Sequence, residues 1–419
     1  MVATRIVATP DVARAKAAHR GSNLGVALFN QGTSTLPGLG WNLRDQVARD
    51  LPTAPSALAW DFLSIALAVF AADRFVLRSE TDDGWTRVMA LDVAVQDPAK
   101  WQPHGDRLAS ALRFLTGDIW TLSFSAGGQK PPNFPARLND RDTVCLFSGG
   151  LDSLLGALHL QHQGKRPLLV SQGSTKEIGP QDNLARKIRL NGFRFDGRVN
   201  EHWRVPYEGS TRARSIIFFA YGALAASAIG KNEVIVPENG LIAINPPLTP
   251  RRLGSLSTRT THPHFLSELG AVLTNVGLNM TFTNIFEGKS KGEMLAECVH
   301  PDAANLAAIS YSCGKGKRRN GQCGRCVPCL IRRASFNAAG LADATNYFDD
   351  IEWSAKYDDV IAARIAVARK AGQTPVEFDR WLAMSGPLPS DPARRAAISH
   401  AVEKGLEEVG SYLAGVRWR

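Results

Sequence analysis

The stretch Val144-Cys145-Leu146-Phe147-Ser148-Gly149-Gly150-Leu151-Asp152-Ser153 decides the fold of this chain. Its first four residues are apolar and predict a short, buried strand. Residues 152–163 follow with leucines at helical spacing and predict a helix. Two glycines between a strand and a helix allow a tight turn and a close approach of the backbone to a ligand. Because the loop amides and the helix N-terminus then face one point, the stretch predicts a binding site for an anion such as phosphate.

Strands and helices alternate beyond this turn. The expected strands lie at residues 144–147, 167–170 and 233–236, with a further strand end near Arg204 and Val205. The expected helices lie at residues 152–163, 181–191 and 215–230. This alternation predicts an α/β fold with a doubly wound, mainly parallel sheet, and a ligand site at the carboxyl ends of its strands.

The chain has 419 residues and is too long for one typical hydrophobic core. We predict an accessory α/β domain at residues 1–140, the core just described at 141–335, and a helical extension at 336–419. The first of these contains a helix at 60–75, strands at 87–95 and 120–124, and a breaker-rich linker at 127–132. The extension contains helices at 361–371, 375–383 and 392–413, for which we expect a role in packing or partner contact.

The polar side chains of the turn add to the predicted phosphate site. Ser148 and Ser153 supply hydroxyl donors, whereas Asp152 would repel phosphate unless it binds Mg²⁺ or shapes the loop. No lysine follows Gly150, so the turn differs from the phosphate loop of kinases and GTPases. The alternative interpretation is a glycine-rich turn of a Rossmann-like sheet that binds no ligand.

Four of the six cysteines cluster with the spacing C-x9-C-x2-C-x2-C: Cys313, Cys323, Cys326 and Cys329. Such short spacings let four thiolates converge on one tetrahedral ion, and Zn²⁺ suits four sulfur ligands. Four protein ligands leave no open position, so we predict a structural zinc site. An iron–sulfur cluster is the alternative. Cys145 lies in the expected strand, and we interpret both Cys145 and Cys298 as structural.

The overall charge and hydropathy constrain the partners of the chain. There are 49 Lys and Arg residues against 39 Asp and Glu residues, a net charge of +10. This excess favours a nucleotide, an RNA or an acidic protein partner, although a generally basic surface gives the same count. The longest apolar stretch, residues 63–72, is about half the length of a membrane-spanning helix. No secretory signal is evident, so we expect a cytoplasmic protein without a membrane anchor.

The sequence Ser-Gly-Gly-x-Asp-Ser at residues 148–153 resembles the PP-loop of ATP pyrophosphatases. That family cleaves ATP between the α and β phosphates and transfers AMP to an oxygen of its substrate. The resemblance implies that Mg²⁺ screens the phosphates and that Asp152 and Ser153 take part in catalysis. It implies ATP binding by Phe147, Ser148, Gly149, Gly150, Leu151, Asp152 and Ser153.

A PP-loop at the start of the core and four cysteines at its end resemble QueC, the family of 7-cyano-7-deazaguanine synthases, over residues 142–335. Two further segments agree. Residues 214–220 resemble the start of a QueC helix, and residues 291–294 resemble a QueC segment in which Lys291 would lie against phosphate as a catalytic residue. The resemblance implies adenylation of 7-carboxy-7-deazaguanine, attack by ammonia to give an amide, and a second activation to the nitrile.

The Asp-Cys-Arg-Pro-Glu-Phe substrate segment of QueC is not present in this chain. The comparable region and the residue that starts the matching helix provide the substrate-binding candidates Arg214, Glu238, Asn239, Arg259 and His262. Arg259 and His262 either face the acyl substrate or only cap a loop. Lys291 has a similar alternative, as a solvated lysine at a helix start.

The N-terminal and C-terminal additions resemble those of the enlarged QueC-like proteins of bacterial antiviral defence, among them QatC and the type IV CBASS homologue. That resemblance implies a protein partner from the same operon, whose amine accepts the activated deazaguanine acid. The other hypotheses are a nitrile or amide synthase that uses ammonia, a tRNA-thiolating PP-loop enzyme, and a nucleotide-sensing scaffold. Nucleic acid is a less favoured partner, and a homo-oligomer is left open.

Overall fold

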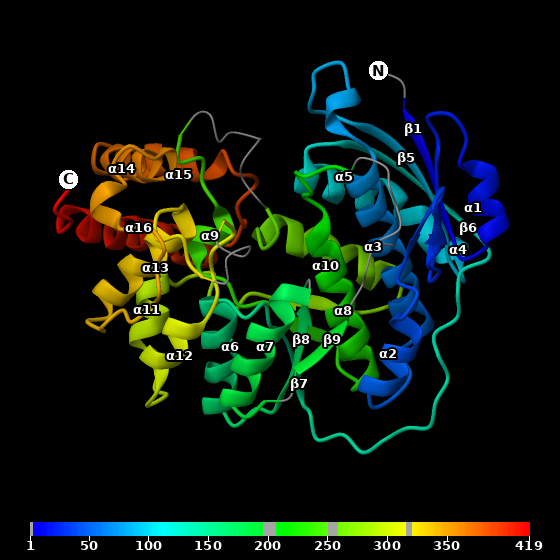
Figure 1. The fold of residues 1–419 in the computed structure, drawn as a ribbon, viewed down its shortest axis with the longest axis horizontal. Coiled ribbons are helices and arrows are strands. Elements are labelled where there is room, and N and C mark those ends of the chain that lie inside the picture. The colour runs from blue at the N-terminus through cyan, green and yellow to red at the C-terminus, as the bar shows by residue number, and fades with distance from the viewer. Residues whose placement is uncertain (1–2, 174, 191, 196–206, 250–258, 316–320) are drawn as a thin grey trace.

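The computed structural model describes residues 3–173, 175–190, 192–195, 207–249, 259–315 and 321–419. Two sheets lie side by side, and a group of helices forms the C-terminal end (Figure 1). The strands are β1 (Thr4–Thr9), β2 (Leu24–Leu28), β3 (Gly32–Thr33), β4 (Leu36–Leu39), β5 (Val88–Ala94), β6 (Ile119–Ser125), β7 (Thr143–Leu146), β8 (Pro167–Gln172), β9 (Gly192–Phe195), β10 (Glu233–Ile235) and β11 (Thr281–Thr283). The helices are α1 (Val12–Ala18), α2 (Leu43–Asp50), α3 (Ala57–Phe75), α4 (Pro98–Trp101), α5 (Gly105–Thr116), α6 (Leu151–His162), α7 (Thr175–Lys187), α8 (Arg214–Ala228), α9 (Gly240–Ile244), α10 (Pro263–Asn275), α11 (Lys291–Ala296), α12 (Ala303–Ile309), α13 (Val327–Ala338), α14 (Asp358–Ala371), α15 (Pro375–Ala383) and α16 (Pro392–Ala414).

The second sheet has the strand order β11-β10-β7-β8-β9, and all its pairs are parallel. Strand β7 is central, with Val144 paired to Leu168 on one side and to Val234 on the other. Helix α8 covers one face, while α6 and α7 pack on the other. The predicted doubly wound, mainly parallel α/β sheet is therefore confirmed, and the turn after β7 lies at the carboxyl ends of the strands.

Two details of the expected elements differ from the structure. Helix α7 begins at Thr175 and continues through Pro180, whereas the sequence analysis placed its start at residue 181. It ends at Lys187, because Arg189 adopts a left-handed backbone with φ of 57°. The strand end expected near residues 204 and 205 lies outside the described residues.

The first sheet has the order β3-β4-β2-β1-β5-β6 and is parallel except for the β3–β4 pair. Helix α3 packs on β2 and β5 of this sheet and also on α8 of the second sheet. Because α3 is enclosed by both, it is apolar on nearly all sides, with Trp60, Phe62 and Ile65 fully buried. One continuous hydrophobic core therefore runs from the first sheet through α3 and α8 to the second sheet. The division at residue 140 stays a prediction.

The segment between β6 and β7, residues 126–142, is described throughout and forms neither helix nor strand. It runs across the end of α2, where the Arg137 guanidinium donates to the carbonyl oxygens of Ala48, Arg49 and Leu51. These bonds also satisfy carbonyl groups that the end of a helix leaves without partners. The linker is thus fixed to the first unit rather than free between two units.

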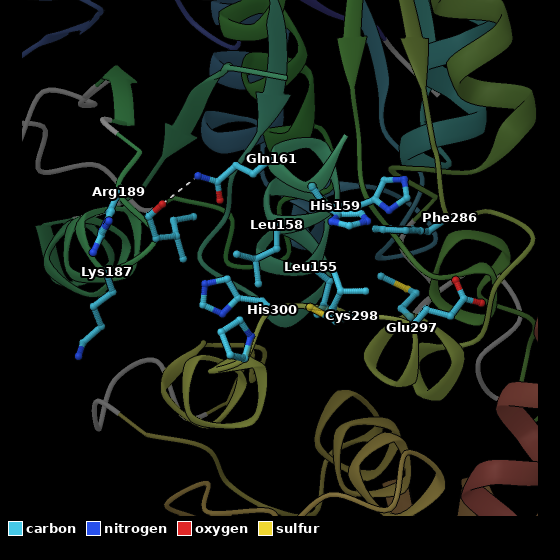
Figure 2. A pocket seen from close by; sticks show the side chains of 15 residues that line it. Leu155, Leu158, His159, Gln161, Lys187, Arg189, Phe286, Glu297, Cys298 and His300 are labelled. Atoms are coloured by element: carbon cyan, nitrogen blue, oxygen red, sulfur yellow. Dashed lines mark hydrogen bonds between the residues drawn. The ribbon is translucent and has the colours of Figure 1, made fainter. Parts of the chain in front are cut away.

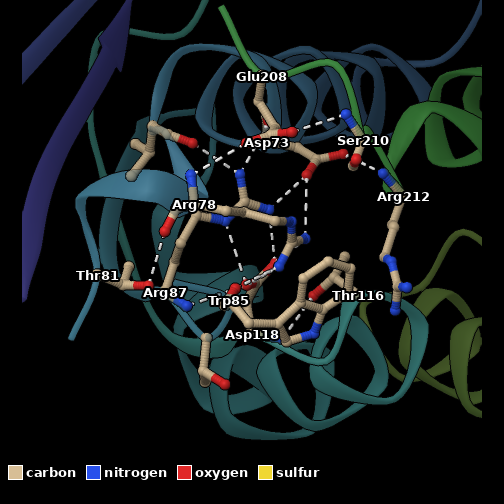
Figure 3. A network of polar contacts seen from close by, with 12 residues as sticks. Asp73, Arg78, Thr81, Trp85, Arg87, Thr116, Asp118, Glu208, Ser210 and Arg212 are labelled. Carbon is tan, nitrogen blue, oxygen red and sulfur yellow. Dashed lines mark hydrogen bonds and ion pairs between the residues drawn. The ribbon is translucent and has the colours of Figure 1, made fainter. Parts of the chain in front are cut away.

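A buried network of ion pairs joins the first sheet to the start of α8 (Figure 3). The Arg87 guanidinium lies 2.6 Å from Asp118 Oδ2 and 2.5 Å from Asp73 Oδ1, and Arg78 lies 2.9 Å from Asp118 Oδ1. All four side chains are nearly excluded from solvent. The second oxygen of Asp73 accepts hydrogen bonds from the amides of Arg212 and Ala213, at 2.6 and 2.7 Å. Two acids and two guanidinium groups balance in charge, so the network can be buried.

The C-terminal residues fold as a third group of helices around a separate apolar cluster. Helix α16 packs on α9, α13 and α14, and it also contacts α11. The three predicted tail helices correspond to α14, α15 and α16. Within the described part of the chain, no helix has both the length and the apolar composition needed to span a membrane.

We expect Asp118→Ala to lower the free energy of unfolding by about 3–5 kcal/mol, because it leaves two buried guanidinium groups without their shared carboxylate. Asp92→Ala is the matched control, since Asp92 pairs with the half-exposed Arg14 and should contribute only about 0–1 kcal/mol. Urea unfolding followed by circular dichroism measures both. Equal effects of the two substitutions would contradict this assignment.

Candidate phosphate loop and metal centre

The loop between β7 and α6 is a tight turn around Gly149, which adopts a left-handed φ of 77°. Only glycine adopts this backbone without strain. The Ser148 hydroxyl lies 3.3 Å from the Gly150 amide and 3.3 Å from the Ser153 hydroxyl, which itself donates to the Gly150 carbonyl at 3.0 Å. The two predicted serines therefore meet on one side of the turn. This places hydroxyl groups, loop amides and the start of α6 around a single point.

Residues from other parts of the chain support this loop. Gln181 Nε2 of α7 donates to the Ser148 carbonyl at 3.0 Å. The Tyr311 amide donates to the Gly149 carbonyl at 2.7 Å, and the Ser312 hydroxyl lies 3.4 Å from the Leu151 amide. Gln181, Tyr311 and Ser312 were not among the site residues predicted from the sequence. Their only sequence signal is the closeness of Ser312 to Cys313, because the contacts are all long-range.

Asp152 lies in the first turn of α6 and points into a buried polar cluster. Its Oδ2 atom lies 3.0 Å from the Lys291 ammonium and accepts a hydrogen bond from Asn239 Nδ2 at 3.1 Å. Lys291 is 3% exposed in its side chain, so the predicted alternative of a solvated lysine is wrong. Asn239 also caps α9 by accepting from the Ile242 amide. The structure thus brings together three residues that the sequence analysis proposed separately.

Glu238 completes this cluster as a second carboxyl group beside Asp152. Burial, followed by the Asp152 charge, raises the pKa of Glu238 well above its ordinary value. Burial also acts to raise the pKa of Asp152, but the Lys291 ammonium and hydrogen bonds from its neighbours hold that pKa below the ordinary value. These opposite directions favour the proton on Glu238 and the negative charge on Asp152. Asp152 Oδ1 has no hydrogen-bond partner within the described chain unless the Glu238 proton supplies one.

The four clustered cysteines converge as the spacing predicts. Their sulfur atoms all lie within 4.8 Å of one another, with Cys313 and Cys326 separated by 3.7 Å and Cys323 and Cys329 by 3.9 Å. A tetrahedral ion with zinc–sulfur bonds of about 2.3 Å requires sulfur–sulfur distances of about 3.8 Å. The four residues could therefore hold a single zinc ion. An iron–sulfur cluster fits less well, because its several atoms hold the four cysteines further apart.

The cysteine site is attached directly to the phosphate loop. Cys313 ends the strip 310–313 that carries Tyr311 and Ser312, and the buried Arg332 of α13 donates to the hydroxyls of Ser310 and Ser312 at 3.0 and 3.2 Å. Helix α13 begins at the ligand Cys326, which is its N-cap residue. A metal ion bound by the four cysteines would therefore fix both the strip 310–313 and the start of α13, which together support the phosphate loop.

Comparison with known proteins fits this arrangement of loop and cysteines. No family model matches the chain. The 7-cyano-7-deazaguanine synthase of Ectopseudomonas mendocina is 22% identical over 235 residues, which cover 50% of this chain and 100% of that protein. The synthase of Novosphingobium aromaticivorans is 27% identical over 234 residues, 49% of this chain and 93% of that protein. The synthase of Nitrosospira multiformis is 23% identical over 231 residues, 49% of this chain and 94% of that protein.

The chain is QueC-like over about half of its length. The relatives are matched almost completely, so the other half of this chain is additional to them. Enlargement of a QueC-like chain agrees with the predicted resemblance, while an antiviral role stays a prediction.

The remaining substrate-binding candidates of this QueC-like chain lie in two places. Arg214 is the first residue of α8. Arg259 and His262 contact Phe114 of α5, with the Arg259 guanidinium donating to the Phe114 carbonyl at 3.2 Å and its carbon 4.7 Å from the ring centroid. His262 is the N-cap of α10 and accepts from the His264 amide, and burial lowers its pKa to about 3. His262 therefore caps the start of a helix, where the sequence suggested a loop cap as the alternative to substrate contact, and substrate contact by all three residues stays a prediction.

The QueC-like core also contains a cavity of about 520 Å³ on the face of the second sheet that α6 and α7 cover (Figure 2). It is lined by the later residues of α6, including Leu155, Leu158 and His159, by the end of α7, and by residues 297–301. The phosphate loop begins α6 at its other end, so the cavity is separate from the loop. Cys298 lines it, and burial raises the pKa of that thiol. Burial likewise raises the pKa of Cys145 to about 12, so neither cysteine is an activated nucleophile.

We expect the purified protein to contain one zinc ion per chain, and Cys326→Ser to lose it. Without the ion the protein should lose several kcal/mol of stability, on the order of 10 °C in Tm, because ligand burial depends on the metal. Elemental analysis and thermal unfolding measure this. Cys298→Ser is the control and should retain zinc, since Cys298 lies outside the cluster. Iron in place of zinc would contradict the assignment.

We also expect Glu238→Gln to flatten the pH dependence of stability. The folded protein keeps a proton on Glu238 where an unfolded glutamate, with a pKa of about 4.3, has lost it. The free energy of unfolding of the wild type therefore falls as pH rises through the raised pKa, and glutamine removes this loss. Urea unfolding from about pH 5 to about pH 9, without Mg²⁺ or nucleotide, measures it.

The variant should be the more stable protein at the upper end of that range. Glu233→Gln, at an exposed position of β10, is the control and should follow the wild type. Parallel curves for wild type and Glu238→Gln would show that Glu238 is ionised like an ordinary surface glutamate.

Proposed function

We propose that this protein uses ATP to adenylate a carboxylate, 7-carboxy-7-deazaguanine, and transfers the acyl group to an amine of a partner protein. The observation that carries the proposal is the glycine turn after β7, where loop amides, two hydroxyls and the Asp152–Lys291 pair meet. The name of the relatives, 7-cyano-7-deazaguanine synthase, supports the choice of the deazaguanine acid.

The loop is suited to bind the phosphates of ATP. The contacts of the Gly150 and Leu151 amides with Ser148 and Ser312 are long, at 3.3 and 3.4 Å. Bonds near the upper limit of length are weak and are readily exchanged for stronger ones to a phosphate oxygen. The helix start adds a partial positive charge, and Lys291 adds a full one nearby.

Asp152 also fits a role in holding Mg²⁺. Its Oδ1 atom is buried and has no hydrogen-bond donor within the described residues other than a protonated Glu238, and carboxylate oxygen is a ligand that Mg²⁺ prefers. Such an ion, when bound, would neutralise charge on the phosphates and on the pyrophosphate that leaves. Lys291 and Asn239 orient the carboxylate from its other oxygen.

The proposed reaction has two steps. A carboxylate oxygen of the acid attacks the α-phosphorus of ATP, the bond to the β-phosphate oxygen breaks, and pyrophosphate leaves with that electron pair. The nitrogen of an amine then attacks the acyl carbon, the carbon–oxygen bond to AMP breaks, and the amine loses a proton. The enzyme contributes by holding both reactants together, which converts the second step into an effectively intramolecular one.

The identity of the amine separates this proposal from a second candidate. The printed name of the relatives favours a synthase in which ammonia is the amine and a second activation gives the nitrile. The half of the chain that is additional to these relatives supports a larger acceptor, because it provides surface to present a protein terminus. The net charge of +10 suits an acidic partner.

We expect Asp152→Asn and Ser153→Ala each to reduce pyrophosphate release by about 100-fold or more, because each removes a group at the reacting phosphates. Asparagine preserves the shape of the Asp152 side chain. In the Asp152→Asn variant, the Lys291 ammonium still has the Glu238 carboxyl group as a neighbour. Asp140→Ala, at an exposed position before β7, is the control and should keep full activity. Pyrophosphate is measured with ATP, Mg²⁺ and 7-carboxy-7-deazaguanine.

The same assay with mass spectrometry of the products tests the substrate and the acceptor. Pyrophosphate release that requires the acid supports its adenylation. Conversion of the acid to a nitrile with ammonia alone would favour the second candidate, whereas an adenylate that reacts only when a partner protein is added supports the first. An absence of acid-dependent release would overturn the choice of substrate.

A further inference from the structure

The tail helix α16 reaches the segment that carries Lys291. Two contacts connect this helix to residues on either side of the lysine. Arg394 Nη2 donates to Glu287 Oε2 at 2.9 Å, and His400 Nε2 lies 2.9 Å from Glu293 Oε1. Both are partly exposed. They show that α16 lies along residues 287–293, but contacts of this kind contribute little free energy by themselves.

A third contact is of a different kind. Glu408 of α16 is 4% exposed, and its carboxylate reaches the residues before and after Lys291. The Ser290 hydroxyl donates to Glu408 Oε1, and the Gly292 amide donates to Glu408 Oε2 at 3.0 Å. A Cβ atom at residue 292 would lie 2.4 Å from Glu408 Oε1, so only glycine permits this approach. The carboxylate therefore binds the Ser290 side chain on one side of Lys291 and the Gly292 backbone amide on the other.

Burial of this carboxylate is costly, because a charged group loses its hydration. Burial accordingly raises the pKa of Glu408 above its ordinary value. An apolar residue in the packed interior of α16 would avoid that cost. The start of α11 does not require Glu408 as a cap, since Ser290 and Glu293 already form a capping box there. The carboxylate is thus an addition to a helix start that is satisfied without it.

We propose that Glu408 is a positioning residue that binds the Ser290 side chain and the Gly292 amide, fixes the segment around Lys291 and so holds its ammonium against Asp152 in the phosphate loop. This inference rests on the proposed use of ATP by that loop. Lysine has a long side chain with four rotatable bonds, so its ammonium is placed only where the backbone and the partner are both fixed. Glu408 fixes the backbone, and Asp152 is the partner, with its Oδ2 atom 3.0 Å from the Lys291 ammonium. The tail helix is in this way part of the support of the active site.

The test compares Glu408→Ala, Glu408→Gln and Glu407→Ala. Alanine removes both hydrogen bonds, and we expect kcat/KM for pyrophosphate release to fall about 10- to 100-fold, the effect of a misplaced group. Glutamine can accept from the Gly292 amide and donate to Ser290, so most of the activity should be retained. Glu407, next to Glu408 on α16 but exposed and paired with Lys370, is the control and should behave as wild type.

A double-mutant cycle separates positioning from a general role in folding. If Glu408 acts through Lys291, the change Glu408→Ala should have almost no further effect in a Lys291→Ala background. If Glu408 had only a structural role, Glu408→Ala would lower Tm and the folded fraction in the wild-type and the Lys291→Ala backgrounds alike. The folded molecules would then keep their KM for ATP. Additive losses in the cycle, or a normal KM and kcat for folded Glu408→Ala, would overturn the inference.

Affinity for Mg·ATP, measured by calorimetry, distinguishes failure of this inference from failure of the proposed function. A wild type that binds Mg·ATP but releases no pyrophosphate with the deazaguanine acid would refute the substrate alone. The cycle can then be measured on Mg·ATP affinity, where a non-additive result supports the role of Glu408 and an additive result overturns it. A wild type that does not bind Mg·ATP would refute both.

Discussion

The buried pair of Lys291 and Asp152 is the interaction on which the architecture of the site depends. A lysine and an aspartate are excluded from water only where their charges and hydrogen bonds are satisfied. The carboxylate is therefore met by Asn239 as well as by the ammonium, and a proton on Glu238 relieves the second negative charge. These groups come from three segments, so the pair fixes the starts of α6, α9 and α11 relative to one another.

The other parts of the chain converge on the same place. The four cysteines fix the strip 310–313, which donates to the Gly149 carbonyl and accepts from the Leu151 amide. The tail helix α16 holds the start of α11 through Glu408. The first sheet shares its core with α8, and Asp73 binds the amides at the start of that helix. A QueC-like core thus receives support from additions on both sides, and a substitution far along the chain can alter the loop.

Much of the fold could be predicted because local patterns dominate it. The apolar run before Ser148, the helix at residues 60–75 and the tail helices follow from periodicity, and the cysteine spacing predicts a shared metal ion. The start of α7 could not be predicted, because proline at position 180 indicates a helix start and the structure continues the helix through it. Within the site, Gln181 and Glu408 gave no signal and Ser312 gave only its closeness to Cys313, since each acts through a contact with a residue distant in sequence.

The sequence by itself determined the chemistry that is local: the glycine turn, its serines and aspartate, and the four thiolates, which need only short spacings to act together. Tertiary structure alone decided which distant residues complete them. It placed Lys291 and Glu238 beside Asp152, and it placed His262 against Phe114. The physical reason is that pKa values and ion pairs depend on burial and on neighbours within a few ångströms, and these are set by the packing of segments that are far apart in the chain.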